Sequence, residues 1–182
     1  TQSYLRGDSD FVTFEATLST AEDQTAIAPG YLEREWRDNG RRYFSYKMDV
    51  PILNFFSFHS ARYAVREDKW NDVAIQIFYH APHDFNVDRM IDATKKSFDY
   101  FTENFSPFQS RQMRILQFPY RTFAQSFPNP VPFSERPRFT ADTPAPDTAH
   151  STLHSTPHPA APPWRAPPLP ATNHPPPPLP AD

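Results

Sequence analysis

The sequence of 182 residues has no cysteine, only three glycines and no long apolar run, and each absence excludes a class of protein. Without cysteine the chain can form neither a disulfide scaffold nor a thiolate metal site, and it has no cysteine nucleophile. Basic residues are not in excess, since the net charge is −3, so no nucleic-acid partner is expected. No apolar run approaches the roughly 18 residues of a membrane-spanning helix, so no span is expected in this chain.

Proline and the aromatic residues divide the chain near residue 135. Of the 23 prolines, 15 lie in residues 136–182, whereas 26 of the 28 aromatic residues lie in residues 1–135. The first part therefore has the side chains for a core. The last 47 residues cannot bury enough apolar surface to offset the entropy lost on ordering. We expect a folded region followed by a disordered Pro-rich tail.

Alternation of apolar and polar residues dominates the first 80 residues. Residues 10–20 alternate in this way, which predicts a half-buried strand. Between residues 31 and 48, the pair Asn39-Gly40 favours a tight turn with positive φ values, so the segments on either side are expected to form a hairpin. Because the same pattern continues to Tyr79, residues 9–80 are expected to form an antiparallel sheet assembly.

The hydrophobic period changes after Asn86, which with Asp84 is a candidate helix N-cap. Apolar residues then fall on one helical stripe until Ser106-Pro107 ends the helix. The stripe consists of Val87, Met90, Ile91, Thr94, Phe98, Phe101 and Phe105. A short strand is predicted at Met113–Phe118, and the prolines of residues 123–135 predict an irregular loop after it. The expected fold class is α+β: an antiparallel sheet or sandwich portion, a helix, a short strand, and then the tail.

Three short sequence segments, in their order along the chain, resemble those of a known family. They are Phe105-Ser106-Pro107-Phe108 at the helix end, the strand Arg114–Phe118, and Phe133-Ser134-Glu135 after the loop. The region 31–135 resembles the aminopeptidase N-like zinc metallopeptidases, peptidase family M1, across the junction of their β-domain and their thermolysin-like catalytic domain. The sequence of residues 123–135 is most similar to that of the branch fused to bacterial ABC transporter permeases. The resemblance therefore implies a peptide substrate, zinc, and a membrane-associated bacterial parent protein.

The chemistry of that family requires residues that this sequence lacks. The resemblance implies a zinc ion held by HExxH and a later Glu, with the Glu of the motif acting as general base. No His-Glu dipeptide occurs anywhere in the chain. We therefore expect no catalytic residue, no metal ligand and no cofactor in the chain itself, which is interpreted as truncated before the zinc motif and inactive.

One substrate-binding element of the family is expected to survive in part. The family's GAMEN loop binds the free amino group of the substrate through its Glu and shapes the cleft through its backbone. Aligned back from Glu135, the corresponding residues are Ala124, Gln125 and Ser126, with Ser126 in place of the Glu. Neutral groups thus replace an anion, and an ordinary surface loop is the competing interpretation.

His80 and His83 form an HxxH pair after a predicted strand. Two ligands leave tetrahedral zinc incomplete, so we interpret both as loop residues rather than as a metal site.

The tail has three interpretations that the sequence leaves open. Its two Pro-Pro-Leu-Pro cores, in residues 166–171 and 175–181, favour polyproline II helix and could bind WW-type or SH3 domains. It could equally be a disordered linker. A shift of reading frame near codon 136 in a GC-rich gene would also give this composition of Pro, Ala, His, Thr and Arg.

The expected organisation is therefore the end of a β-domain over residues 1–84, the start of a catalytic domain over 85–135, and the tail over 136–182. The function predicted from the resemblance is that of a fragment of a zinc-dependent aminopeptidase. The alternative is a non-enzymatic β-rich binding module that presents a polyproline tail to WW or SH3 partners.

Overall fold

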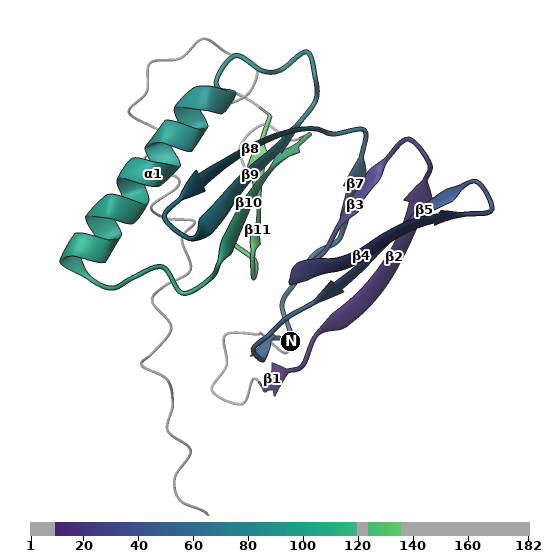
Figure 1. Cartoon of the computed structure of the whole chain (residues 1–182), viewed down its shortest axis with the longest axis horizontal. Helices are drawn as coiled ribbons and strands as arrows, with labels where there is room; N and C mark the ends of the chain where they lie inside the picture. Colours follow the sequence, from purple (N-terminus) through teal and green to yellow (C-terminus); the bar gives the residue numbers. More distant parts are fainter. Residues whose placement is uncertain (1–9, 120–123, 136–182) are drawn as a thin grey trace, which may run out of the picture.

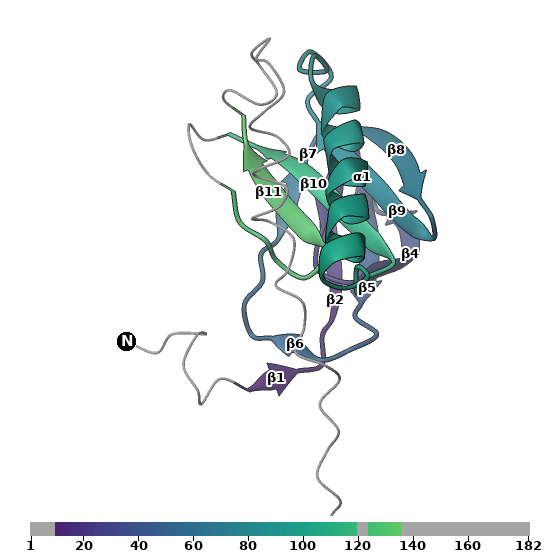
Figure 2. The ribbon, with the colours of Figure 1, turned by 90° about the vertical axis from the view of Figure 1, so that its left-hand side faces the viewer.

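The computed structural model describes residues 10–119 and 124–135, which form three layers (Figure 1). The helix α1 (Val87–Asn104) covers one face of a mixed sheet. The opposite face of that sheet packs against antiparallel strands from the N-terminal part of the chain. Figure 2, turned by 90°, shows α1 lying in front of the mixed sheet. The α+β class predicted from the sequence is confirmed, and the proline-rich tail lies outside the described residues.

The N-terminal layer contains one three-stranded sheet and two short strand pairs. The sheet has the order β2-β5-β4 and is antiparallel throughout. Its strands are β2 (Glu15–Ala21), β4 (Tyr31–Asp38) and β5 (Arg41–Lys47). The short pairs are β1 (Phe11–Val12) with β6 (Ile52–Leu53), and β3 (Thr25–Ile27) with β7 (His59–Ala61). Buried aromatic residues of β5, Phe44 and Tyr46, form the centre of the core of this layer.

The hairpin predicted between residues 31 and 48 is confirmed. Both residues of its turn have positive φ, 48° at Asn39 and 70° at Gly40. Asparagine tolerates this conformation and glycine adopts it without steric cost, so the turn matches the twist of the two strands.

The mixed sheet contains two strands that precede α1 in the sequence and two that follow it, in the order β11-β10-β9-β8. Its strands are β8 (Ala64–Trp70), β9 (Val73–Tyr79), β10 (Gln112–Phe118) and β11 (Pro130–Ser134). The hairpin β8–β9 is antiparallel, as expected, but β9, β10 and β11 run parallel to one another. The boundary expected at residues 84 and 85 falls between β9 and α1, so this one sheet has strands from both predicted domains.

Alternation along β9 and β10 determines which side chains face each layer. Ile75, Ile77 and Ile115 face α1, whereas Phe78 and Leu116 pack with Ile27 of β3 on the other face. A sheet that is buried on both faces needs mainly apolar strands. β9 is apolar except at Gln76, whereas β10 also contains Gln112, Arg114 and Gln117.

The helical stripe is confirmed over most of its length. Val87, Met90, Ile91 and Phe98 are buried against the sheet. Phe105 lies just after the helix and is 65% exposed, because α1 ends before the next turn of the stripe.

The loop predicted from the prolines is wrong over Pro130–Ser134, where β11 pairs parallel with β10. The carbonyl oxygens of Pro130 and Pro132 point away from β10 and accept hydrogen bonds from the amides of Phe127 and Gln125, at 3.0 and 3.3 Å. Main-chain groups alternate between the two edges of a strand, so these prolines lack an N–H only on the outer edge. Their rings therefore interrupt no hydrogen bond to β10.

Arg114 of β10 connects the mixed sheet to the N-terminal layer. Its side chain is 1% exposed, its guanidinium donates a hydrogen bond to the carbonyl oxygen of Gly30, and it lies 5.1 Å from the ring centroid of Tyr46. Burial lowers the pKa of Arg114 to about 10. Burial also raises the pKa of the Tyr46 phenol above its usual range. The two layers thus share a buried polar contact as well as an apolar core.

Candidate functional site

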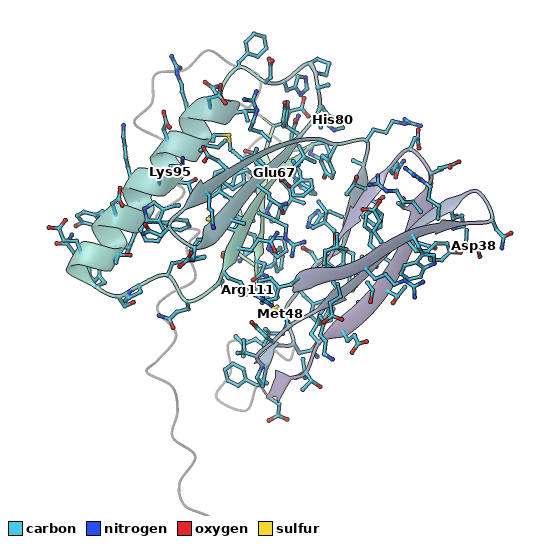
Figure 3. All side chains as sticks on the ribbon, viewed as in Figure 1. Asp38, Met48, Glu67, His80, Lys95 and Arg111 are labelled. Atoms are coloured by element: carbon cyan, nitrogen blue, oxygen red, sulfur yellow. The ribbon has the colours of Figure 1, made fainter. Side chains whose placement is uncertain are left out.

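Three parallel strands have their C-terminal ends at the same end of the mixed sheet. His80 follows β9, Gln117 lies near the end of β10, and Glu135 follows β11. Figure 3 shows His80 at this end of the sheet. Ligands of open sheets with parallel strands bind beyond the carboxyl ends of the strands, so this end of the sheet is the candidate functional site.

Gln117 is buried at this end of the sheet and connects β10 to the loop after β9. Its side chain is 1% exposed, and its Oε1 accepts a hydrogen bond from the amide of His80 at 2.8 Å. Its Nε2 lies 2.6 Å from Nδ1 of His83. Because an amide nitrogen only donates, Nδ1 of His83 is the acceptor in this contact. Gln117 therefore holds the loop after β9 against β10. This role was not predicted from the sequence, where its only signal is a glutamine beside the apolar pair Ile115-Leu116.

These residues do not fit a zinc ion. Within residues 10–119 and 124–135, no group of three or more His, Cys, Asp or Glu side chains could hold a metal. The lone pair of Nδ1 of His83 is used by Gln117, and Glu135 Oε1 lies 4.0 Å from that nitrogen. The rings of His80 and His83 pack edge to face with centroids 6.1 Å apart. The HxxH pair therefore packs as part of a loop in this arrangement.

The predicted substrate-binding residues lie along the outer edge of β11. Ala124 forms an antiparallel bridge with Phe133, and the amides of Gln125 and Phe127 bond to β11 as described above. Because neighbouring residues of an extended chain point their main-chain groups to opposite edges, the amide of Ser126 faces away from β11. The segment 124–127 thus lies antiparallel beside β11, joined to it by one bridge and two hydrogen bonds.

The side chains of this edge are neutral at the three predicted positions. Gln125 donates from Nε2 to the carbonyl oxygen of Ser126 at 3.2 Å, and Ser126 has no charge with which to bind an ammonium group. Phe127 packs against Phe55 of the N-terminal layer with ring centroids 4.8 Å apart. The edge is therefore supported by both layers of the structure.

Tyr63 packs at the C-terminal end of the mixed sheet, beside Gln117 and His80. Its hydroxyl donates a hydrogen bond to the main-chain oxygen of Gln117 at 3.3 Å, and its ring centroid lies 6.0 Å from that of His80. Burial raises the pKa of the Tyr63 phenol to about 12. The neutral phenol is therefore the form that the folded state favours.

Stability is expected to fall between pH 10 and pH 12, in part through Tyr63. Below pH 10 the phenol is protonated in both states, and above pH 10 the unfolded state loses the proton first, which favours unfolding. The shift of Tyr63 corresponds to a loss of about 2 kcal/mol by pH 12. Urea unfolding from pH 9 to pH 12 should show a shallower decline for Tyr63→Phe than for the wild type. Identical declines would contradict this assignment, because the contributions of all other groups are common to both proteins.

The described fold combines an antiparallel β-layer with a helix-covered mixed sheet whose outer edge is extended by residues 124–127. Solved structures of M1 zinc metallopeptidases have this fold. The enzyme from Deinococcus radiodurans matches with a TM-score of 0.64 and a mutant form of it with 0.65. A two-domain M1 zinc metallopeptidase mutant bound to L-arginine matches with a TM-score of 0.64.

Each of the three structures is 17% identical to this chain, and each match covers 81% of this chain and 34% of the matched one. The chain thus spans about a third of the length of these structures, and the match establishes an M1-like fold. No protein-family model matches the sequence, and no curated protein matches it significantly.

Proposed function

We propose that this chain supplies the peptide-positioning edge of a zinc-dependent aminopeptidase and does not hydrolyse peptides by itself. The observation that carries the proposal is the segment Ala124 to Phe127, hydrogen-bonded along β11 with the amide of Ser126 directed outward. An exposed strand edge binds an extended peptide through main-chain hydrogen bonds. The M1-like fold supports a peptidase context for this edge.

The proposed inactivity rests on the chemistry that the sequence lacks. Hydrolysis in this class of enzyme requires a metal-bound water and a general base, and no His-Glu dipeptide occurs in the 182 residues. The neutral Ser126 in place of a Glu also removes the group that would bind a substrate ammonium. The chain would therefore align a peptide main chain without activating water.

The sequence of residues 123–135 supports a more specific proposal, that the parent protein belongs to the permease-fused branch of the aminopeptidases. Such a parent would be membrane-associated in a bacterium. Nothing helical in the described part of the chain has the length and apolar character that a bilayer span requires. In this proposal the membrane segments would come from elsewhere in the parent protein.

Ser126→Pro is expected to abolish binding of an extended tetra-alanine peptide at this edge. Proline removes the outward-facing N–H but leaves the amides of Gln125 and Phe127 bonded to β11. Ser126→Ala keeps the N–H and is the matched control, which should bind like the wild type. Chemical shifts of the amides of residues 124–127 during titration measure the binding. Equal binding by Ser126→Pro and Ser126→Ala would contradict the proposed edge.

A further inference from the structure

A cleft of about 520 Å³ lies at the opposite end of the mixed sheet from His80. It is formed by the start of β4, the end of β5, and the residues at the start of β9 and β10. Figure 3 shows Arg111 and Met48, two of its lining residues, side by side between the mixed sheet and the N-terminal sheet. The volume lies within the roughly 300–1,000 Å³ of small-molecule sites in proteins.

The guanidinium of Arg111 is held in place in this cleft. It lies 3.9 Å from the ring centroid of Tyr31, and Nη2 is 3.8 Å from Oδ2 of Asp49. The second distance is an ion pair but too long for a hydrogen bond. The Arg111 side chain is 65% exposed. A guanidinium that is stacked on a ring, with N–H donors still directed to solvent, is preorganised to bind a carboxylate in a bidentate manner.

The charges around the cleft are balanced rather than of one sign. Arg111 and Lys47 contribute two cations, and Glu33 and Asp49 contribute two anions. Lys47 pairs only loosely with Glu15, since Nζ and Oε2 are 3.6 Å apart and both side chains are more than half exposed. An anionic ligand would be repelled by Asp49 and a cationic ligand by Arg111, whereas a ligand with both charges satisfies both groups.

We propose that this cleft binds a small zwitterion, an α-amino acid or a dipeptide. The ligand carboxylate pairs with Arg111 and the ligand ammonium pairs with Asp49. The side chain of the ligand packs on the apolar part of the wall, to which Leu32, Met48 and Ala74 contribute. The site is separate from the edge at residues 124–127, because none of those residues lines the cleft. It does not depend on the proposed peptidase context.

Titration of the ¹⁵N-labelled full chain with the dipeptide alanyl-alanine tests the proposal. We expect saturable shifts of the amides of Met48, Ala74 and Gln112. N-acetyl-alanyl-alanine, which lacks the ammonium, and alanyl-alanine amide, which lacks the carboxylate, should each bind at least about tenfold more weakly. Arg111→Gln and Asp49→Asn should each weaken binding of the uncapped dipeptide by at least about tenfold as well. Both replaced side chains are at least half exposed, so the variants are expected to fold.

Arg37→Gln is the matched control, because Arg37 is 62% exposed and lies 3.9 Å from Glu22 outside the cleft. It should bind the dipeptide like the wild type. The proposal is overturned if no amide of the cleft shifts saturably at millimolar dipeptide, if the capped dipeptides bind equally well, or if Arg111→Gln binds like Arg37→Gln. Shifts confined to residues 124–127 would support the proposed peptide edge and overturn the cleft.

Discussion

Phe98→Ala is expected to lower the free energy of unfolding by about 3–5 kcal/mol. Phe98 is 1% exposed and lies between α1 and the mixed sheet, with ring centroids 5.2 Å from Trp70 and 4.5 Å from Phe108. Its removal leaves a cavity that rigid neighbours on both sides cannot fill. The loss is a large fraction of the roughly 5–15 kcal/mol that stabilises a typical domain.

The matched control is Tyr100→Ala on the same helix. Tyr100 is 52% exposed, and its ring contacts are with Phe101 and Phe105 at the helix end. Its replacement should change the free energy of unfolding by no more than about 1 kcal/mol. Urea unfolding followed by circular dichroism measures both variants. Similar losses for Phe98→Ala and Tyr100→Ala would show that α1 is not packed as described.

Gly30→Ala is expected to destabilise the chain by about 3 kcal/mol or more. Gly30 has φ of +91°, and a Cβ there would lie 2.6 Å from both the carbonyl carbon and the carbonyl oxygen of Lys47. These are backbone atoms of a central strand, so they cannot move aside as a flexible side chain could. The carbonyl of Gly30 also accepts the hydrogen bond from the buried Arg114, which a shift of the backbone would break.

Gly40→Ala separates the effect of positive φ from that of steric clash. Gly40 has φ of +70°, and nothing lies within 4 Å of a Cβ built there. The expected loss is about 1–2 kcal/mol, the cost of a left-handed conformation alone. Thermal and urea unfolding of the two variants measure the difference. A loss for Gly30→Ala no larger than that for Gly40→Ala would contradict the close approach of Gly30 to β5.

Local patterns in the sequence predict most individual elements. The positive φ values that Asn39 and Gly40 permit specify the hairpin β4–β5, and the apolar stripe from Val87 to Phe98 specifies α1. These features depend on residues close together in the chain, and their physical cause can be read from residue type and spacing.

Features that depend on distant parts of the chain were not predicted. Whether Pro130 and Pro132 interrupt a strand depends on which edge they face, and that is decided by the pairing of β11 with β10. Likewise, Arg114 and Gln117 look like polar interruptions of an apolar strand until their partners, Gly30 and the loop after β9, are known. Sequence spacing carries no information on such partners.

The substrate-binding role of residues 124–126 stays a prediction, and the structure adds only where these residues lie. Residues 124–126 were selected from the resemblance, and their place on the edge of β11 supports the proposed peptide-binding role without testing it. The neutral character of Ser126 and Gln125 follows from the sequence alone. The contacts of Gln117 and Tyr63 at the C-terminal end of β10 required the three-dimensional arrangement.

An aminopeptidase assay of the purified chain with added zinc tests the central claim most directly. A panel of aminoacyl p-nitroanilides, with zinc content measured on the same sample after dialysis, gives both readouts. The account predicts no release of p-nitroaniline above the buffer rate and no stoichiometric zinc, because the chain lacks the HExxH ligands and the general base. Zinc-dependent turnover by the 182-residue chain, abolished by a chelator, would contradict it.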